Sequence, residues 1–368
     1  MSGAPASLPE DYARALAAVG AASLAALETL EAAARRLHPP ALPELRARTA
    51  PVHARLLAAC EGFRRSLPPP GLEAFHDQLS SGADAALDAA RDLVAEGVPG
   101  YPTLVLRALR HHCRAQELLY PLRGVLPPLG RYFAEPACHA RLEELDPEPE
   151  DGASVGLHQA EGPGPDGRGG FSLYVPERYR AGTPWPLVVA LHGGHGLGRN
   201  FLWTWLREAR SRGFLLLAPT SRGSTWALDS PAAETAALAS MLDFVRERWN
   251  VDPARVLLTG LSDGATFTLL AGLAEGAPYS ALAPVSGVLH PHAHRLGLLD
   301  RARGRRIYLV HGALDWLFPV SLARMARDAL EQAGADLCYR EIADLSHTYP
   351  REENAAILRW LDPGLAAD

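Results

Sequence analysis

Residues 255–270 have the sequence RVLLTGLSDGATFTLL, and this stretch decides the fold of the C-terminal half. A short apolar run ends near Thr259, a glycine-bounded turn follows, and a helix-period pattern begins at Ala265. The turn has the form Gly260-x-Ser262-x-Gly264, in which a sharp strand-to-helix turn lifts a serine hydroxyl above the edge of a sheet. Such a turn crowds the positions two before and two after the serine, so glycine is expected at both. The stretch predicts a strand, a candidate nucleophile and a helix.

A second copy of the frame, Gly152-Ala153-Ser154-Val155-Gly156, lies in a different context. Ser154 follows an acidic, proline-bearing segment, with no apolar strand before it and no helix directly after it. We therefore interpret Ser154 as a serine that fell between two glycines and Ser262 as the candidate nucleophile.

The sequence beyond residue 152 alternates short apolar runs with helix-period segments, which predicts a mostly parallel sheet of about eight strands with helices on both faces. Around the turn-rich residues 162–167, two strand-like runs within residues 153–176 predict an antiparallel hairpin at one edge. Strands are expected at Phe171–Val175, Pro186–Leu191, Phe214–Ala218, Val256–Leu258, Ala281–Val285, Ile307–Val310 and Leu337–Ile342, and helices at about 200–212, 232–249, 264–274, 320–334 and 352–361.

Residues 1–145 predict a separate helical bundle, because their apolar positions recur at helical spacing. Helix breaks are expected at His38-Pro39-Pro40, at residues 68–71 (PPPG) and at Pro99-Gly100. The acidic residues 146–152 (DPEPEDG) predict a linker, and residues 153–368 a catalytic domain.

Composition limits the partners and the compartment. The net charge of -6 gives no electrostatic reason to bind nucleic acid or an anionic membrane. All 36 basic residues are arginine, which excludes lysine-based catalysis. Four scattered cysteines predict reduced thiols in a cytoplasm, and the acidic residues before the apolar run 15–27 predict a helix there, neither a signal peptide nor a membrane span.

A serine nucleophile requires a base, an acid that orients the base, and an oxyanion site. His347 follows the last expected strand and is the candidate base, and Asp315 follows the strand at Ile307–Val310 and is the candidate acid. A glycine-rich turn after Leu191 frees backbone N–H groups. We assign the two oxyanion donors to the amides of Gly194 and Asp263.

The chain resembles the phospholipase/carboxylesterase branch of the α/β-hydrolase superfamily, near dienelactone-hydrolase-like and polyhydroxyalkanoate-depolymerase-like esterases, over about residues 153–362. The motifs that carry the resemblance are His192-Gly193-Gly194, Gly260-Leu261-Ser262-Asp263-Gly264, His311-Gly312-x-x-Asp315 and Ser346-His347. It implies the Ser, Asp, His order of the triad and a pocket lined by residues 219–226. Dienelactone hydrolases carry Cys at the elbow, and residues 1–145 lie outside the compact family pattern.

Substrate contacts are expected from Trp226, Trp316 and Arg222, which suit an uncharged, fairly apolar ester, with Arg222 also able to hold a carboxylate. The histidines of His290-Pro291-His292-Ala293-His294 could share a metal, but no Cys or carboxylate stands close in sequence to complete a site. His111-His112-Cys113 lies in a helix pattern, where adjacent side chains point apart. No metal or cofactor is expected.

The sequence thus predicts a serine esterase that acts on small-molecule esters through an acyl-enzyme. A serine peptidase or thioesterase on the same fold, or a non-catalytic scaffold that uses the N-terminal helices, remain alternatives. Those helices could also join protomers into a homo-oligomer.

Overall fold

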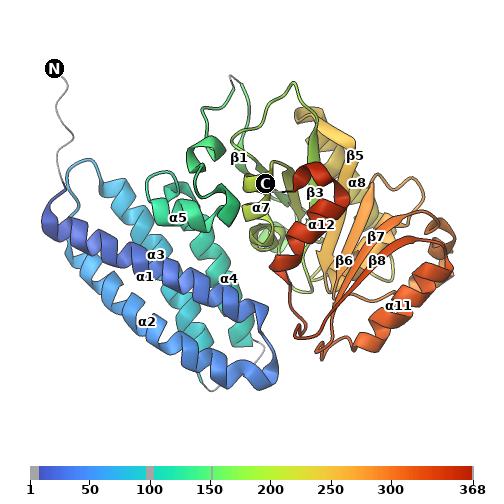
Figure 1. The fold of residues 1–368 in the computed structure, drawn as a ribbon, viewed down its shortest axis with the longest axis horizontal. Coiled ribbons are helices and arrows are strands. Elements are labelled where there is room, and N and C mark those ends of the chain that lie inside the picture. The colour runs from blue at the N-terminus through green and yellow to red at the C-terminus, as the bar shows by residue number, and fades with distance from the viewer. Residues whose placement is uncertain (1–7, 97–102, 151, 367–368) are drawn as a thin grey trace. The chain divides into compact units, whose positions relative to one another are not determined.

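The computed structural model describes residues 8–96, 103–150 and 152–366, and the chain divides into two compact units, Met1–Phe133 and Ala134–Asp368 (Figure 1). The division falls before residue 145, the expected end of the helical domain. Residues beyond Phe133 are fastened to the sheet-bearing unit by two ion pairs, Glu135 with Arg212 at 2.6 Å and Asp146 with Arg210 at 2.7 Å. The segment expected as a linker therefore begins with an anchored residue; Asp151 lies outside the described residues.

The first unit is a bundle of helices whose apolar faces meet in one core. Prolines separate the first three helices as predicted, because proline removes a backbone donor and ends the helical pattern. The predicted break at Pro99-Gly100 lies outside the described residues. The helices are α1 (Glu10–Arg35), α2 (Leu42–Arg65), α3 (Glu73–Val94), α4 (Thr103–Leu119) and the short α5 (Pro127–Tyr132).

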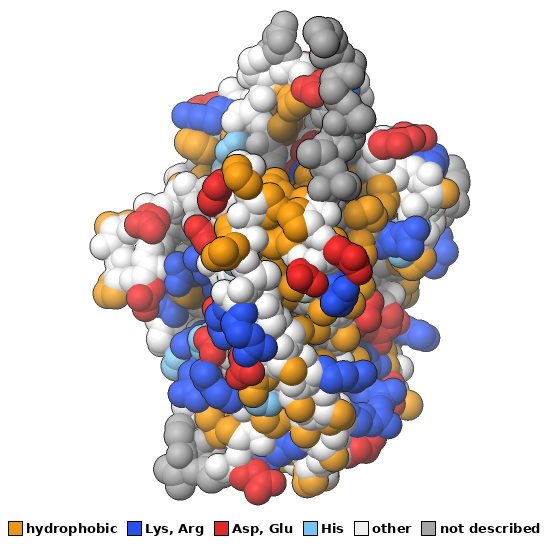
Figure 2. Space-filling view, turned by 90° about the vertical axis from the view of Figure 1, so that its left-hand side faces the viewer, with side chains coloured by type: hydrophobic (Ala, Val, Ile, Leu, Met, Phe, Trp, Pro, Cys, Tyr) orange, Lys and Arg blue, Asp and Glu red, His pale blue; other side chains and the backbone are white. Residues whose placement is uncertain are grey.

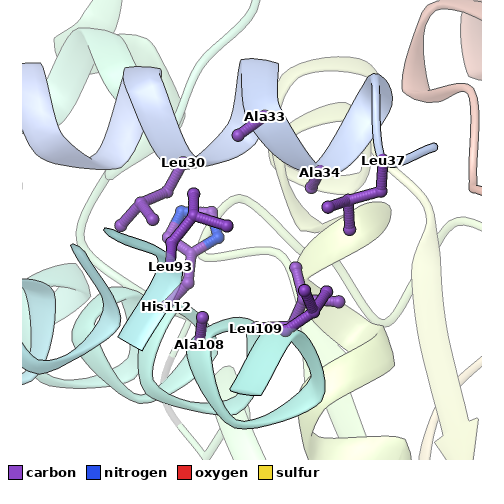
Figure 3. Close-up of a pocket in the computed structure, with 9 residues that line it drawn as sticks. Leu30, Ala33, Ala34, Leu37, Leu93, Ala108, Leu109 and His112 are labelled. Carbon is purple, nitrogen blue, oxygen red and sulfur yellow. The ribbon is translucent and has the colours of Figure 1, made fainter. Parts of the chain in front are cut away.

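A small hollow in this bundle lies between side chains of α1, α3 and α4 (Figure 3). Its lining is apolar apart from His112, and Leu30, Leu93 and Ala108 are at most 4% exposed. The hollow is thus part of the bundle core.

Helix α1 is long and apolar enough to cross a membrane by length and composition. Val19, Ala26 and Leu27 are nevertheless fully buried in the bundle. Part of this apolar helix therefore belongs to the core of the unit, although only 28% of its most apolar window is buried.

The second unit contains an eight-stranded sheet in the order β1-β2-β4-β3-β5-β6-β7-β8. The hairpin β1–β2 and the pair β2–β4 are antiparallel, and all other pairs are parallel, as predicted. The strands are β1 (Gly156–Ala160), β2 (Phe171–Val175), β3 (Trp185–Leu191), β4 (Leu215–Pro219), β5 (Val251–Leu261), β6 (Ala281–Val285), β7 (Arg306–Gly312) and β8 (Asp336–Ile342).

Helices cover both faces of the sheet. All five residues of β4 and of β6 are buried, and successive strand residues point to opposite faces, so neither face is open to solvent there. The helices of this unit are α6 (Gly198–Phe201), α7 (Leu206–Arg212), α8 (Ala232–Arg248), α9 (Asp263–Gly272), α10 (Pro291–Arg295), α11 (Val320–Gln332) and α12 (Asn354–Leu361).

This topology determines where a site forms. Strands β3, β5, β7 and β8 are parallel, so their carboxyl ends lie at one edge of the sheet. The turns that follow Leu191, Leu261, Gly312 and Ile342 therefore meet there.

Candidate active site

Ser262 lies in the turn between β5 and α9, with φ 57° and ψ -119°. A non-glycine residue at positive φ is strained and needs close support from its surroundings. The flanking glycines provide the room: a Cβ on Gly260 would lie 2.6 Å from the backbone of Gly264, and one on Gly264 would lie 2.5 Å from the backbone oxygen of His192. This turn can form only with glycine at both positions.

His347 lies between Ser262 and Asp315. Its Nε2 is 2.9 Å from Ser262 Oγ and its Nδ1 is 2.8 Å from Asp315 Oδ2. Ser262 is 8% exposed and Asp315 is 5% exposed, so the chain of hydrogen bonds is largely removed from water. The ring of Phe318 packs edge-on against the imidazole at a centroid distance of 5.2 Å.

The loop after β7 holds the Asp315 carboxylate in a fixed orientation. Oδ1 accepts hydrogen bonds from the backbone N–H groups of Leu317 and Phe318, at 3.0 and 2.8 Å, which leaves Oδ2 for His347. A Cβ on Gly312 would overlap the backbone oxygen of Leu345. Glycine at 312 thus lets the histidine loop cross directly over the end of β7.

His311 also lies beside this carboxylate, with Nε2 3.4 Å from Asp315 Oδ2 and 2.8 Å from the backbone oxygen of Phe318. Burial lowers the pKa of His311, so its ring is neutral near pH 7. His311 belongs to the motif His311-Gly312-x-x-Asp315, but the sequence alone indicated no role for its side chain. The contacts indicate that it supports the acid loop.

The turn after β3 brings Gly194 next to the start of α9. A Cβ on Gly194 would lie 2.9 Å from Asp263 Oδ2, and one on Gly193 would lie 3.5 Å from Ser262 Cβ. Asp263 is the first residue of α9, and the first N–H groups of a helix have no partner within it. The two candidate oxyanion donors thus lie in neighbouring backbone segments beside the serine.

His192 fixes the shape of this turn, a role that sequence reasoning missed. Its Nδ1 is 2.6 Å from the backbone oxygen of Gly193, and its Nε2 accepts a hydrogen bond from the N–H of Ser221 at 3.1 Å. Burial is the main cause that lowers the pKa of His192 to about 4. The ring is therefore neutral and can accept from Ser221 while it donates to Gly193.

The three residues expected to contact substrate lie in different environments. Trp226 is 2% exposed, stacks on Phe267 and donates its indole N–H to the backbone oxygen of His192 at 2.7 Å. It therefore lies in the core, where it supports the oxyanion turn. Trp316 is 47% exposed beside Asp315, and Arg222 is exposed, with its backbone N–H bonded to Glu234.

Ser154 lies before β1, away from any helix start, and is exposed. Its backbone oxygen accepts the indole N–H of Trp249 at 2.9 Å. Its hydroxyl has none of the surroundings found at Ser262.

The structure supplies the carboxylate that the sequence around His290 lacked. Among the described residues, one group of three has metal-ligand atoms close together, and it consists of Asp229, His290 and His292. Both ring Nδ1 atoms already accept hydrogen bonds, that of His290 from the N–H of His292 and that of His292 from the Arg295 guanidinium. Nδ1 of each ring is thus occupied by a hydrogen bond, and the Arg295 cation stands alongside, which disfavours a metal. The other histidine motif, His111-His112-Cys113, lies in α4 of the helical unit, where His111 Nε2 is 3.7 Å from Asp92 Oδ2.

Comparison with known proteins places part of the second unit in a known family. Residues 234–363 match the phospholipase/carboxylesterase family, which confirms the resemblance for the segment that contains Ser262, Asp315 and His347. Acetylxylan esterase A of Emericella nidulans is 30% identical over 110 residues, covering 27% of this chain and 36% of that protein. A bifunctional acetylxylan esterase/xylanase of Neocallimastix patriciarum is 28% identical over 197 residues, covering 51% and 27%.

The chain thus spans between about a quarter and a third of the length of these curated relatives. Among solved structures, a thermostable esterase matches with a TM-score of 0.45 and 23% identity, over 52% of this chain and 58% of that one. An acetyl xylan esterase from Aspergillus awamori matches with a TM-score of 0.45 and 18% identity, over 57% and 99%.

Proposed function

We propose that this protein is a serine esterase that hydrolyses carboxylic esters through an acyl-enzyme. The observation that carries the proposal is the continuous chain of hydrogen bonds from Ser262 Oγ through His347 to Asp315. A bare serine hydroxyl is a poor nucleophile near neutral pH, and an adjacent, oriented imidazole is the group that activates it. The match of residues 234–363 to the phospholipase/carboxylesterase family supports the same chemistry.

In the proposed reaction, Ser262 Oγ attacks the ester carbonyl while its proton passes to His347 Nε2. Asp315 accepts the Nδ1–H of the imidazole, holds the tautomer and stabilises the imidazolium. The oxyanion accepts hydrogen bonds from the amides of Gly194 and Asp263, each worth roughly a hundred- to a thousand-fold in rate. His347 then protonates the leaving alcohol, and water repeats the sequence on the acyl-enzyme. No step requires a metal or a cofactor.

The relatives named as acetylxylan esterases favour ester over amide hydrolysis, so we rank the esterase above a serine peptidase. We further propose a cytoplasmic location, because the four cysteines, all among the described residues, form no disulfide. The helical unit is a candidate surface for self-association. In the space-filling view of Figure 2, charged side chains of both signs interrupt the apolar ones.

The proposal is tested with a fluorophosphonate probe on wild type, Ser262→Ala and Ser154→Ala, with p-nitrophenyl acetate and butyrate hydrolysis followed in the same samples. We expect Ser262→Ala to lose labelling and roughly 10⁴- to 10⁶-fold in kcat, and Ser154→Ala to behave like wild type. Wild-type protein that neither labels nor turns over would contradict the proposal and direct attention to the helical unit.

A further inference from the structure

The side chain of Asp263 has no role in the proposed triad, although its backbone amide serves as an oxyanion donor. Its carboxylate is partly buried and is held by Thr225, whose Oγ1 donates to Oδ2 at 2.6 Å. Thr225 lies in the loop after β4, so two separate segments fix the position of the charge. Within the described part of the chain, no arginine or histidine side chain forms an ion pair with this carboxylate within 4 Å.

The carboxylate lies next to the oxyanion position. A Cβ on Gly194 would be 2.9 Å from Oδ2, and standard bond lengths place such a Cβ about 2.5 Å from its own amide nitrogen. Oδ2 is therefore within about 5.5 Å of the Gly194 N–H that is proposed to bind the oxyanion. The nearby His192 is neutral, because burial holds its pKa at about 4, so it does not offset the charge.

A fixed negative charge at this position opposes catalysis on a neutral ester. Negative charge develops on the carbonyl oxygen in the transition state, and like charges at short range in a partly buried site repel strongly. The proposed mechanism uses only the backbone amide of residue 263, so an uncharged side chain there would suit a neutral ester better. A positive group on the substrate, placed between the carboxylate and the developing oxyanion, reverses the effect and stabilises both.

The acyl side of the ester is the place for such a group. The alcohol leaves after the first half of the reaction, so a cation on the alcohol would offset the charge of Asp263 only during acylation. A cation on the acyl group stays through deacylation as well, when the oxyanion forms a second time. An ammonium on the α-carbon lies about 3 Å from the carbonyl oxygen by bond geometry, which is within reach of a carboxylate beside the oxyanion site.

Resting on the proposed esterase function, we infer that Asp263 and Thr225 form a specificity site for a cationic α-substituent, so that the preferred substrates are esters of α-amino acids. A carboxylate accepts charge-assisted hydrogen bonds from an ammonium group, whereas a methyl group in the same place offers it none. Substrates with the ammonium group should therefore bind more tightly. An anionic acyl group is repelled. The proposed preference for a cationic acyl group replaces the sequence-based expectation of an uncharged, fairly apolar ester.

The test uses the full chain and three benzyl esters of similar shape: glycine benzyl ester, benzyl propionate and monobenzyl malonate. Release of benzyl alcohol is followed by chromatography at pH 6.5, below the ordinary α-amino pKa of about 8, so that the glycine ester is cationic. We expect wild type to show kcat/KM at least ten-fold higher for the glycine ester than for the propionate ester, and the lowest value for the malonate ester.

The ratio of the first two values is then measured in Asp263→Asn, in Thr225→Val and in the control Asp229→Asn. Asparagine keeps the size and the backbone amide but removes the charge, so the ratio should fall several-fold, toward the ratio set by the greater intrinsic reactivity of the α-ammonium ester. Thr225→Val, which frees the carboxylate, should lower it less. Asp229 is an exposed carboxylate in the same loop as Thr225, and its variant should keep the wild-type ratio.

Three outcomes overturn the inference: a wild-type ratio near one, an unchanged ratio in both Asp263→Asn and Thr225→Val, or an equal fall in Asp229→Asn. Fluorophosphonate labelling of each variant shows whether its serine is still active. If wild type labels and hydrolyses all three esters equally, the specificity site is wrong and the esterase stands. If wild type neither labels nor hydrolyses any ester, the esterase itself is wrong.

Discussion

The two glycine-serine-glycine frames, residues 152–156 and 260–264, share a sequence pattern and differ in their physical surroundings. In the first, a Cβ on Gly152 or Gly156 would meet nothing within 4 Å, and Ser154 is exposed. In the second, both glycines are in close contact with backbone, and the serine is held at positive φ within reach of a histidine. The comparison teaches that crowding by neighbouring segments distinguishes an elbow from an accidental match.

The largest expected effect comes from adding one methyl group to the last glycine of each frame. Gly264→Ala places Cβ against the backbone of β3, so we expect a loss of roughly 3 kcal/mol or more in the free energy of unfolding. Gly156→Ala has open space and only its positive φ of 87° to oppose it, so about 1 kcal/mol is expected. Urea unfolding measures both. Equal losses would contradict the argument from crowding.

The free energy of unfolding should also fall in acid, because His192 is buried in the turn next to the second frame. His192 has a folded pKa of about 4 against a reference value of 6.5. Above pH 6.5 the ring is neutral in both states and contributes nothing. As the pH falls from 6.5 to 4, the unfolded chain binds a proton that the folded chain does not, so the fold loses about 3 kcal/mol.

Urea unfolding from pH 7 to pH 4 measures this dependence. In His192→Gln the decline in stability between pH 6.5 and 4 should be shallower by one proton, while the exposed His294→Gln should follow the wild-type curve. A wild-type slope retained in His192→Gln would show that other groups cause the acid sensitivity.

The smallest expected effect concerns two buried tryptophans, one beside each frame. Trp226 donates to the backbone oxygen of His192 and Trp249 to that of Ser154. Replacing either by phenylalanine removes one hydrogen bond, at a cost of about 1 kcal/mol in stability. Only Trp226→Phe should also reduce kcat, because only its partner belongs to the oxyanion turn. Ester hydrolysis by the two folded variants checks this, and a matching fall in Trp249→Phe would refute the assignment.

Sequence reasoning predicted the strands well because each buried strand needs an apolar run and each turn needs residues that permit it. The β1–β2 hairpin and the parallel order of the later strands followed from that alternation. The burial and contacts of single side chains near the site were harder to predict. Trp226 was expected to line the pocket but is buried against Phe267, and Asp229 joins His290 from a loop about sixty residues away in the chain. Local pattern does not report which face of a loop packs inward.

The sequence by itself determined the two halves of the chain, the alternation that builds the sheet, and the order of the serine, the acid and the histidine. These features depend on local periodicity and on which residues can occupy a turn. Only the tertiary structure showed how closely backbone crowds the glycines around Ser262, and that His192 is neutral. It also showed that, among the described residues, no cationic side chain pairs with the Asp263 carboxylate beside the oxyanion turn. Those properties depend on distances between segments that parallel strands bring to one edge of the sheet, and no short stretch of sequence contains them.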